Sequence, residues 1–158
     1  MDAASAGPID AAVDVLGDRW TLLVLRDVIF ADRRHFRALL TGSTEGIASN
    51  ILADRLVRLV DAGILTRGTA FRGQRARYSL TEAGIQTLPV ICALGNWGLD
   101  WRSGSDDLRS RQRFMRDEGA AFIDELMDEL RTRHLDAPPA PHDGPSPFER
   151  LDSATLHG

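Results

Sequence analysis

Residues 33–77 read RRHFRALLTGSTEGIASNILADRLVRLVDAGILTRGTAFRGQRAR and decide the fold that we expect. They carry nine arginines against Glu45, Asp54 and Asp61, in a chain whose formal net charge is −4. The remaining residues are therefore strongly acidic. Because a local excess of positive charge attracts the phosphates of a nucleic acid, this stretch predicts a DNA-binding surface on an acidic body.

Apolar residues recur at helical spacing before this stretch and at its start. Residues 9–16 predict a short helix. Residues 19–29 predict a buried helix that is apolar nearly all round, with Asp18 as its N-cap. Asp32 is expected to cap a third helix over residues 33–40, with its arginines facing outward.

The fourth predicted helix, over residues 49–62, is the element expected to read DNA. Leucines recur on one side at helical spacing. The other side begins with Ser49 and Asn50, whose small and amide side chains can enter the major groove and hydrogen-bond to base edges. Helix-start residues on an ordinary solvated face have the same composition, so this pattern alone leaves both interpretations open.

Two short strand-like runs follow, over residues 64–71 and 76–80. The connection between them contains Gly73, which favours a β-hairpin. Arg72 and Arg75 lie at its tip, where guanidinium groups could bind phosphates or enter a minor groove. Exposed arginines are common on solvated hairpins, but a hairpin after two such helices is the wing of a winged helix-turn-helix.

These elements together predict a DNA interface. The predicted residues are Ser49, Asn50, Ala53, Asp54, Arg55, Arg58, Arg34, Arg37, Arg67, Arg72, Arg75 and Arg77. The first four would approach bases, and the arginines would lie near phosphates or the minor groove. Asp54 fits this surface only if it accepts a hydrogen bond from a cytosine amine or pairs with Arg58 at i,i+4 spacing.

The chain after residue 80 predicts dimerisation. A long helix beginning after Thr81 is expected to kink at Pro89, because proline lacks an N–H and crowds the preceding turn. Two-fold pairing through this helix would place two reading helices about one turn of DNA apart. The candidate interface residues are Ile85, Leu88, Cys92, Leu94, Trp97 and Trp101, although packing inside the protomer is an equal alternative for each one.

We therefore predict a mainly α-helical fold with a small β-hairpin, a winged helix-turn-helix with a long dimerisation helix and an extra C-terminal helix. Residues 7–102 would form the DNA-binding and dimerisation domain. Residues 103–136 would add a helical extension that covers the dimerisation helix or a pocket. The proline-rich residues 137–158 would form a flexible tail.

Five blocks of the sequence, in the right order, resemble HxlR-type transcriptional regulators. They are PIDAAVDVLGDRW (8–20), RHFRAL (34–39), GIASNILADRL (46–56), LVDAGIL (59–65) and RYSLTEAG (77–84). The resemblance covers about residues 7–101. It implies a dimeric, MarR-like winged-helix regulator of transcription, of a kind that often responds to reactive or aromatic small molecules. Many members have a cysteine directly before the opening proline, and some use it as a redox switch, but Gly7 occupies that position here.

Two kinds of regulation are considered. A small-molecule effector could bind in a pocket lined by Trp20, Phe30, Trp97 and Trp101, although core packing is the better default for all four. Cys92 is the one cysteine in the sequence, and its apolar neighbours favour a packed, unreactive thiol. Redox sensing would require a bridge between the Cys92 residues of two protomers.

The sequence contains no catalytic motif. There is no Gly-X-Ser-X-Gly elbow, no phosphate-binding glycine loop and no metal-ligand spacing of His or Cys, so we expect no enzyme, cofactor or metal site. The absence of a signal-like start and of any long apolar run predicts a cytoplasmic protein without a membrane partner.

The hypothesis is thus a homodimeric regulator, a repressor more than an activator, that binds a palindromic operator in double-stranded DNA. Two alternatives remain. The winged helix could serve protein–protein contacts, or the chain could be a non-thiol ligand sensor without tight DNA binding.

Overall fold

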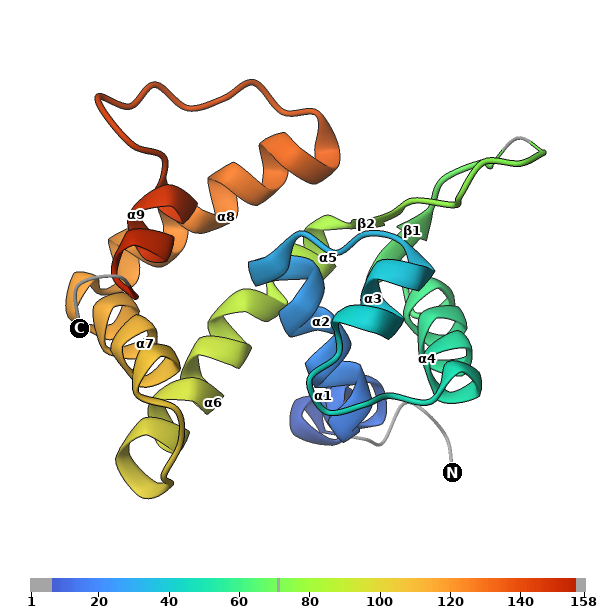
Figure 1. The fold of residues 1–158 in the computed structure, drawn as a ribbon, viewed down its shortest axis with the longest axis horizontal. Coiled ribbons are helices and arrows are strands. Elements are labelled where there is room, and N and C mark those ends of the chain that lie inside the picture. The colour runs from blue at the N-terminus through green and yellow to red at the C-terminus, as the bar shows by residue number, and fades with distance from the viewer. Residues whose placement is uncertain (1–6, 71, 156–158) are drawn as a thin grey trace. The chain divides into compact units, whose positions relative to one another are not determined.

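The computed structural model describes residues 7–70 and 72–155 (Figure 1). They form two compact units, within residues 1–79 and 80–158, which are described separately below. The division falls inside the second strand, not at the predicted boundary after residue 102. The fold is mainly helical with a two-stranded hairpin, which confirms the predicted fold class. None of the described helices is both long and apolar enough to cross a membrane.

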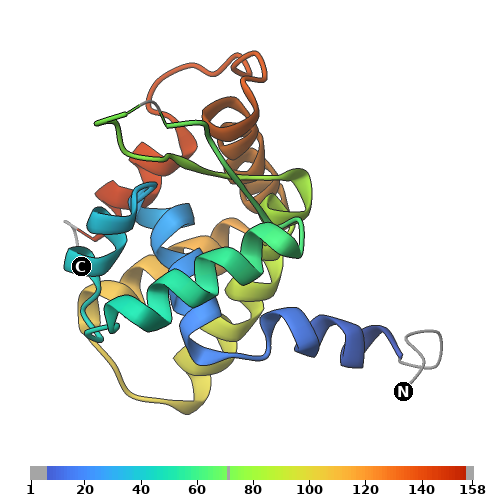
Figure 2. The ribbon, with the colours of Figure 1, turned by 90° about the vertical axis from the view of Figure 1, so that its right-hand side faces the viewer.

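The first unit contains the helix-turn-helix and most of the hairpin. Its elements are α1 (Pro8–Leu16), α2 (Arg19–Ala31), α3 (Phe36–Gly42), α4 (Ser49–Asp61), β1 (Leu65–Arg67) and β2 (Tyr78–Leu80), the last of which continues into the second unit. Helix α4 crosses α2 and also packs on α3 and β1 (Figure 2). The buried core of this unit includes Leu25, Val28, Ile29, Leu39, Leu52, Leu56, Leu59 and Leu65.

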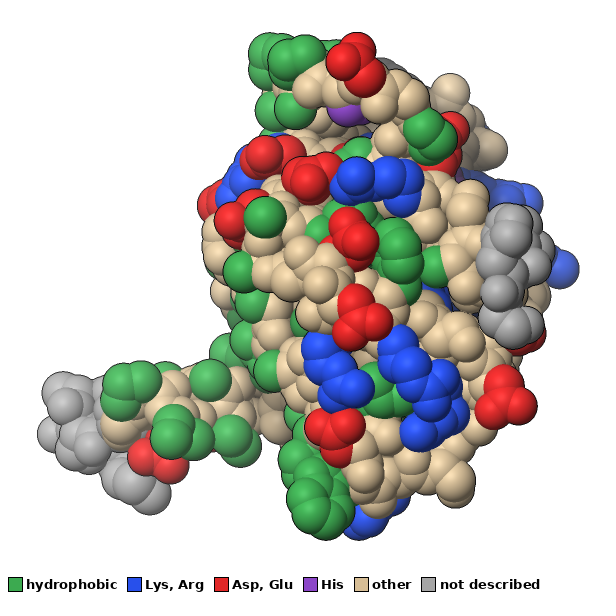
Figure 3. Space-filling model, turned by 90° about the vertical axis from the view of Figure 1, so that its left-hand side faces the viewer, with side chains coloured by type: hydrophobic (Ala, Val, Ile, Leu, Met, Phe, Trp, Pro, Cys, Tyr) green, Lys and Arg blue, Asp and Glu red, His purple; other side chains and the backbone are tan. Residues whose placement is uncertain are grey.

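Helix α1 contributes nothing to this core. None of its residues is buried, and Ile9 and Val13 are 79% and 57% exposed. Hydrophobic side chains are accordingly visible along α1 in Figure 3. The helix that follows begins where predicted, because the Asp18 carboxylate accepts a hydrogen bond of 3.0 Å from the backbone N–H of Thr21.

The start of α3 differs from the prediction. Asp32 does not cap α3: it ends α2 in the left-handed conformation, with φ of 48°. Aspartate is favoured both at helix N-caps and in left-handed positions, so sequence alone could not separate the two roles. As a result Arg33 and Arg34 lie in the connection before α3, and His35 is its N-cap residue.

The hairpin has shorter strands than predicted. A hydrogen bond of 2.8 Å from the Gly68 N–H to the Arg77 carbonyl continues the pairing beyond β1 and β2. Gly73 adopts a φ of 86° in the turn, a conformation that favours glycine. Phe71, the last residue of the first predicted strand, lies outside the described residues.

The second unit consists of helices: α5 (Glu82–Ile85), α6 (Thr87–Trp101), α7 (Asp106–Glu118), α8 (Ala120–Leu135) and α9 (Pro147–Ser153). The Thr81 hydroxyl caps α5 by accepting from the Gly84 N–H, as predicted. The expected kink at Pro89 is instead a break at Gln86, between α5 and α6. Pro89 is thereby the third residue of α6, where no intrahelical N–H donor is needed.

The C-terminal extension contains more structure than predicted. The expected single helix is divided at Gly119, whose φ is 80°, into α7 and α8. The proline-rich tail is not wholly flexible, because it contains α9, which begins with a capping box of Ser146 and Glu149. Phe148 and Leu151 of α9 are buried, at 2% and 0% exposure.

Three hydrogen bonds hold α8 and α9 within this unit. The Glu129 carboxylate on α8 accepts hydrogen bonds from the Phe148 N–H and the Ser146 hydroxyl. The Leu80 N–H donates to His134 Nδ1 at 3.0 Å, so the start of the unit is bound to the end of α8. The extension is therefore an integral part of the second unit.

Candidate nucleic-acid interface

Helix α4 exposes the face that the sequence predicts for reading bases. Its opposite face packs inward through Leu52, Leu56 and Leu59, each at most 1% exposed. The exposed residues are Ser49, Asn50, Ala53, Asp54, Val57, Arg58 and Asp61. No side chain caps the N-terminus of α4, so the N–H groups of its first turn can bind an anion. Val57 was not in the predicted set, although its helical spacing from Asn50 and Ala53 places it on this face.

Asp54 is paired within α4. Its carboxylate lies 3.0 Å from Arg58 Nε and 2.6 Å from an Arg55 Nη atom. The i,i+4 pair with Arg58 is one of the two arrangements that the sequence allowed for Asp54. Because the carboxylate is compensated by two guanidinium groups, it repels a nearby phosphate less than an unpaired aspartate would.

Arg55 binds inside the first unit. Its Nε lies 2.7 Å from Asp18 Oδ1 and its second amino group 3.1 Å from Asp18 Oδ2, a bidentate ion pair between α4 and the N-cap of α2. The Arg55 guanidinium keeps the pKa of the Asp18 carboxyl well below its ordinary value. The geometry therefore indicates that Arg55 positions α4, with its guanidinium directed to Asp18 and Asp54 within the unit.

Arg34 binds other residues of the first unit, and this corrects the prediction that it contacts DNA. Its side chain is buried, at 5% exposure for the residue. Its guanidinium donates to the Tyr78 carbonyl at 3.0 Å and to the Ser79 hydroxyl. Its own carbonyl accepts from the Tyr78 N–H at 2.8 Å. Arg34 thus joins the connection before α3 to strand β2.

The other predicted arginines of α3 and the hairpin are exposed. They are Arg37, Arg67, Arg72, Arg75 and Arg77. Across residues 7–70 and 72–155, no acidic side chain lies within ion-pair distance of any of the five. By contrast, the face in Figure 3 mixes acidic and basic side chains. The hairpin arginines are therefore free to neutralise phosphates.

The predicted dimer residues divide into two groups. Ile85, Leu88 and Cys92 are buried within the protomer, at 0%, 0% and 7% exposure, so they cannot form a surface. Leu94, Trp97 and Trp101 are 50%, 54% and 69% exposed, and the unpredicted Val90 joins them at 45%. These four residues recur at intervals of four, three and four, which places them on one face of α6. We call them the α6 stripe.

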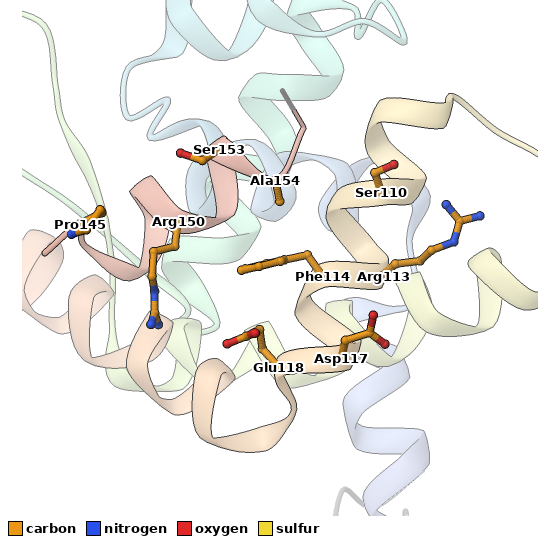
Figure 4. Close-up of a pocket in the computed structure, with 9 residues that line it drawn as sticks. All are labelled: Ser110, Arg113, Phe114, Asp117, Glu118, Pro145, Arg150, Ser153 and Ala154. Carbon is orange, nitrogen blue, oxygen red and sulfur yellow. The ribbon is translucent and has the colours of Figure 1, made fainter. Parts of the chain in front are cut away.

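None of the four residues of the predicted effector pocket lines either of two cavities in the second unit. Trp20 and Phe30 are half-buried in α2, and Trp97 and Trp101 belong to the α6 stripe. One cavity, of about 680 Å³, lies between α7 and α9, with Phe114 pointing from α7 toward α9 (Figure 4). This cavity is open to solvent, and its lining includes several charged side chains. It extends to Ala154, close to the last described residue.

The second cavity, of about 390 Å³, lies between α6, α7 and α8. Its apolar lining includes Cys92, Met115, Ile123 and Met127, and its polar lining includes Asn96, Gln112 and Asp124. Gln112 donates to the Asn96 side chain at 2.8 Å and to the Cys92 carbonyl at 3.2 Å. The lining is thus mostly apolar, with a few polar groups that these hydrogen bonds hold in place.

Cys92 has the unreactive environment that its neighbours predict. Its side chain is buried, and burial raises the pKa of the thiol to about 11. The thiolate population at neutral pH is therefore very small. His35, the N-cap residue of α3, places Nδ1 3.0 Å from the Ala76 carbonyl. Within the described ranges, no group of three or more His, Cys, Asp or Glu residues is arranged to hold a metal ion.

The chain is similar to regulators of transcription. Residues 15–106 match the model of a family described as HxlR-like helix-turn-helix. An uncharacterised HTH-type transcriptional regulator of Mycobacterium bovis is 37% identical over 91 residues, which cover 57% of this chain and 56% of that protein. A similarly described regulator of Synechocystis is 35% identical over 95 residues, covering 60% of this chain and 69% of that protein. The chain thus matches little more than half the length of the Mycobacterium relative.

A solved structure has the same fold. The crystal structure of PA1607, assigned as a candidate transcription factor, superposes with a TM-score of 0.58 at 33% identity, over 65% of this chain and 70% of that one. The family match ends at residue 106, the first residue of α7. Helices α7, α8 and α9 therefore lie beyond the part of the chain that defines the family.

Proposed function

The chain belongs to the HxlR-like helix-turn-helix family, a family of transcriptional regulators and not of enzymes, and from this we propose that it binds operator DNA and regulates transcription. One observation carries the proposal. The exposed face of α4 and the unpaired arginines of the hairpin belong to one compact unit whose fold is that of a DNA-reading module.

In this proposal the two elements have different roles. Ser49, Asn50 and Ala53 on α4 approach base edges in the major groove, and Arg58 lies beside them near a phosphate. Arg37, Arg67, Arg72, Arg75 and Arg77 contact the flanking backbone or the minor groove. Arg34 and Arg55 hold α4 and the hairpin in place without contacting DNA.

We infer a homodimer on a palindromic operator. The α6 stripe exposes two tryptophans and two aliphatic side chains, and aromatic anchors of this kind dominate protein interfaces. A second copy covering the stripe would remove them from water and would supply a second α4 for the other half-site. Sedimentation velocity of the wild type and of Trp97→Glu tests this interface. A wild-type dimer that becomes a monomer in Trp97→Glu would support the α6 stripe as the dimer interface, and an unchanged dimer would exclude it.

Repression by steric blocking of a promoter is the mode of action we propose, with a small molecule as effector. The cavity between α6, α7 and α8 supports an effector, because it borders the helix that carries the α6 stripe. A molecule bound there could alter dimer geometry without contacting DNA.

Fluorescence anisotropy tests the proposed function. The protein is titrated against the intergenic DNA upstream of its own gene and against random duplex, at two salt concentrations. Salt-sensitive binding with a preference of ~10³ or more for the upstream DNA is the expected result. Weak, equal binding to both duplexes would contradict the proposal and would favour a winged helix used for protein contacts.

A further inference from the structure

Helix α4 carries an exposed apolar patch that the fold does not explain. The patch consists of Ala53 and Val57. Val57 is 60% exposed. The structure describes every residue of α4, and among them Val57 is the one large apolar residue that is exposed. Valine is a poorer helix former than alanine because its branched Cβ restricts the side chain. An exposed valine in the middle of α4 therefore weakens the helix slightly and gains little from burial.

The patch lies in the centre of the face that would enter the major groove. Asn50, Ala53 and Val57 follow one another at spacings of three and four residues, so their side chains share one side of the helix. Asp54 and Arg58, at the edge of this face, bind each other. The two residues that follow Asn50 along this line, Ala53 and Val57, are therefore aliphatic.

The distance along the helix suits neighbouring base pairs. Asn50 and Val57 are separated by seven residues, which at a rise of 1.5 Å per residue corresponds to about 10.5 Å along the axis. Base pairs are spaced by about 3.4 Å along each strand. A helix lying in the groove would thus place Val57 within about three base pairs of the base that Asn50 contacts.

The chemistry of the groove identifies what an aliphatic patch would bind. The C5 methyl of thymine is the apolar group that base edges present in the major groove, and small aliphatic side chains contact it. We propose that Ala53 and Val57 bind thymine methyl groups and select a T·A pair in each operator half-site. Because a carboxamide such as that of Asn50 pairs best with adenine, the half-site core would be rich in A·T pairs.

This inference rests on the proposed function, since α4 must enter the groove, and it adds the identity of the bases that are read. The experiment begins with selection of a binding sequence from random duplexes. Each thymine of a half-site and its symmetry mate are then replaced by deoxyuridine, which removes only the C5 methyl. We expect one thymine position at which Kd rises about fourfold per half-site, or about fifteenfold for both, as the loss of a buried methyl predicts.

Variants of α4 link this effect to the patch. Val57→Ala should weaken binding to the thymine operator by a comparable or larger factor and should no longer distinguish thymine from deoxyuridine at that position. Val57→Thr, which keeps one methyl group and the branched shape, should retain part of the discrimination. The control Arg113→Ala changes an exposed residue of α7, outside the unit that contains α4, and should leave the discrimination intact.

The outcomes separate the two proposals. Val57→Ala should be at least as thermally stable as the wild type by circular dichroism, since alanine is the better helix former, so weaker binding cannot be attributed to unfolding. If no sequence is selected and duplex binding is weak, the proposed function fails and this inference fails with it. If an operator is selected but no thymine methyl matters, or Val57→Ala keeps full discrimination, the role of the patch is overturned while DNA binding stands.

Discussion

Replacing Arg72 by alanine tests whether the hairpin tip contacts phosphates. Arg72 and Arg75 are exposed, and neither has an acidic partner among the described residues. Their positive charge is therefore not compensated within the protein. If the tip lies against DNA, each guanidinium displaces the counterions of about one phosphate.

The magnitude follows from the number of phosphates that each variant leaves without an arginine. Each neutralised phosphate contributes about 0.9 to the slope of log K against log salt concentration. In a dimer Arg72→Ala frees about two phosphates, so the slope should decrease by about 1.8, and the double change with Arg75→Ala should decrease it by about 3.6. Over a fourfold increase in salt, the wild type should lose about tenfold more affinity than Arg72→Ala.

The assay is fluorescence anisotropy with operator and random duplexes. It is repeated at several salt concentrations between about 50 and 200 mM, a range over which phosphate contacts change the affinity strongly. Arg113→Ala is the matched control, because Arg113 is an exposed arginine of α7 and its loss changes the net charge equally. The Arg72 effect should be the same on both duplexes, since phosphate contacts carry no sequence information. An unchanged slope for Arg72→Ala, or an equal decrease for Arg113→Ala, would refute the contact.

Three further predictions concern stability and reactivity. Arg55→Ala should lower the free energy of unfolding, measured by urea denaturation, by about 1–2 kcal/mol, because it leaves the Asp18 carboxylate without its bidentate partner. Arg58→Ala should change this free energy by less than about 0.5 kcal/mol. Equal effects of the two variants would contradict the structural role of Arg55. Arg26 lowers the pKa of Glu45 from its ordinary value of 4.5 to about 2, so the stability from this pair is complete above pH 4.5 and is lost as the pH falls toward 2. Thermal melts between those pH values should show a smaller decline for Glu45→Gln than for the wild type, and parallel curves would exclude the pair as a cause. Burial raises the pKa of the Cys92 thiol to about 11, so at neutral pH this thiol should react with iodoacetamide far more slowly in the folded protein than in urea. Mass spectrometry would follow the labelling. Rapid labelling of the folded protein would show that the thiol is accessible.

The sequence predicts the helix-turn-helix well, for local reasons. Helix α4 has leucines at helical spacing and a glycine shortly after its end, and α2 begins at an aspartate N-cap, so neighbouring residues alone determine both elements. The hairpin follows from its turn glycine and from the aliphatic residues on either side. The exposed residues of α4 follow from the same periodicity.

The roles of individual arginines could not be predicted in this way. Arg34 binds residues 44 and 45 positions further along the chain, and Arg55 binds Asp18, 37 positions earlier. No local pattern distinguishes these buried or paired arginines from the exposed ones of the hairpin. Helix α9 was missed because a proline-rich segment precedes it, although Ser146, Pro147 and Glu149 form a recognisable helix start.

The link between Arg34 and β2 has a consequence for the DNA that this protein can bind. The backbone and the guanidinium of Arg34 both hold the second strand, so the base of the hairpin is attached to the connection between α2 and α3 at several points. In the proposed complex with DNA, the separation between the base pairs contacted by α4 and the phosphates contacted by the hairpin would then be fixed by the protein. A duplex lengthened by one base pair between these positions could satisfy only one set of contacts at a time, and operators of this regulator should tolerate base changes there more readily than insertions.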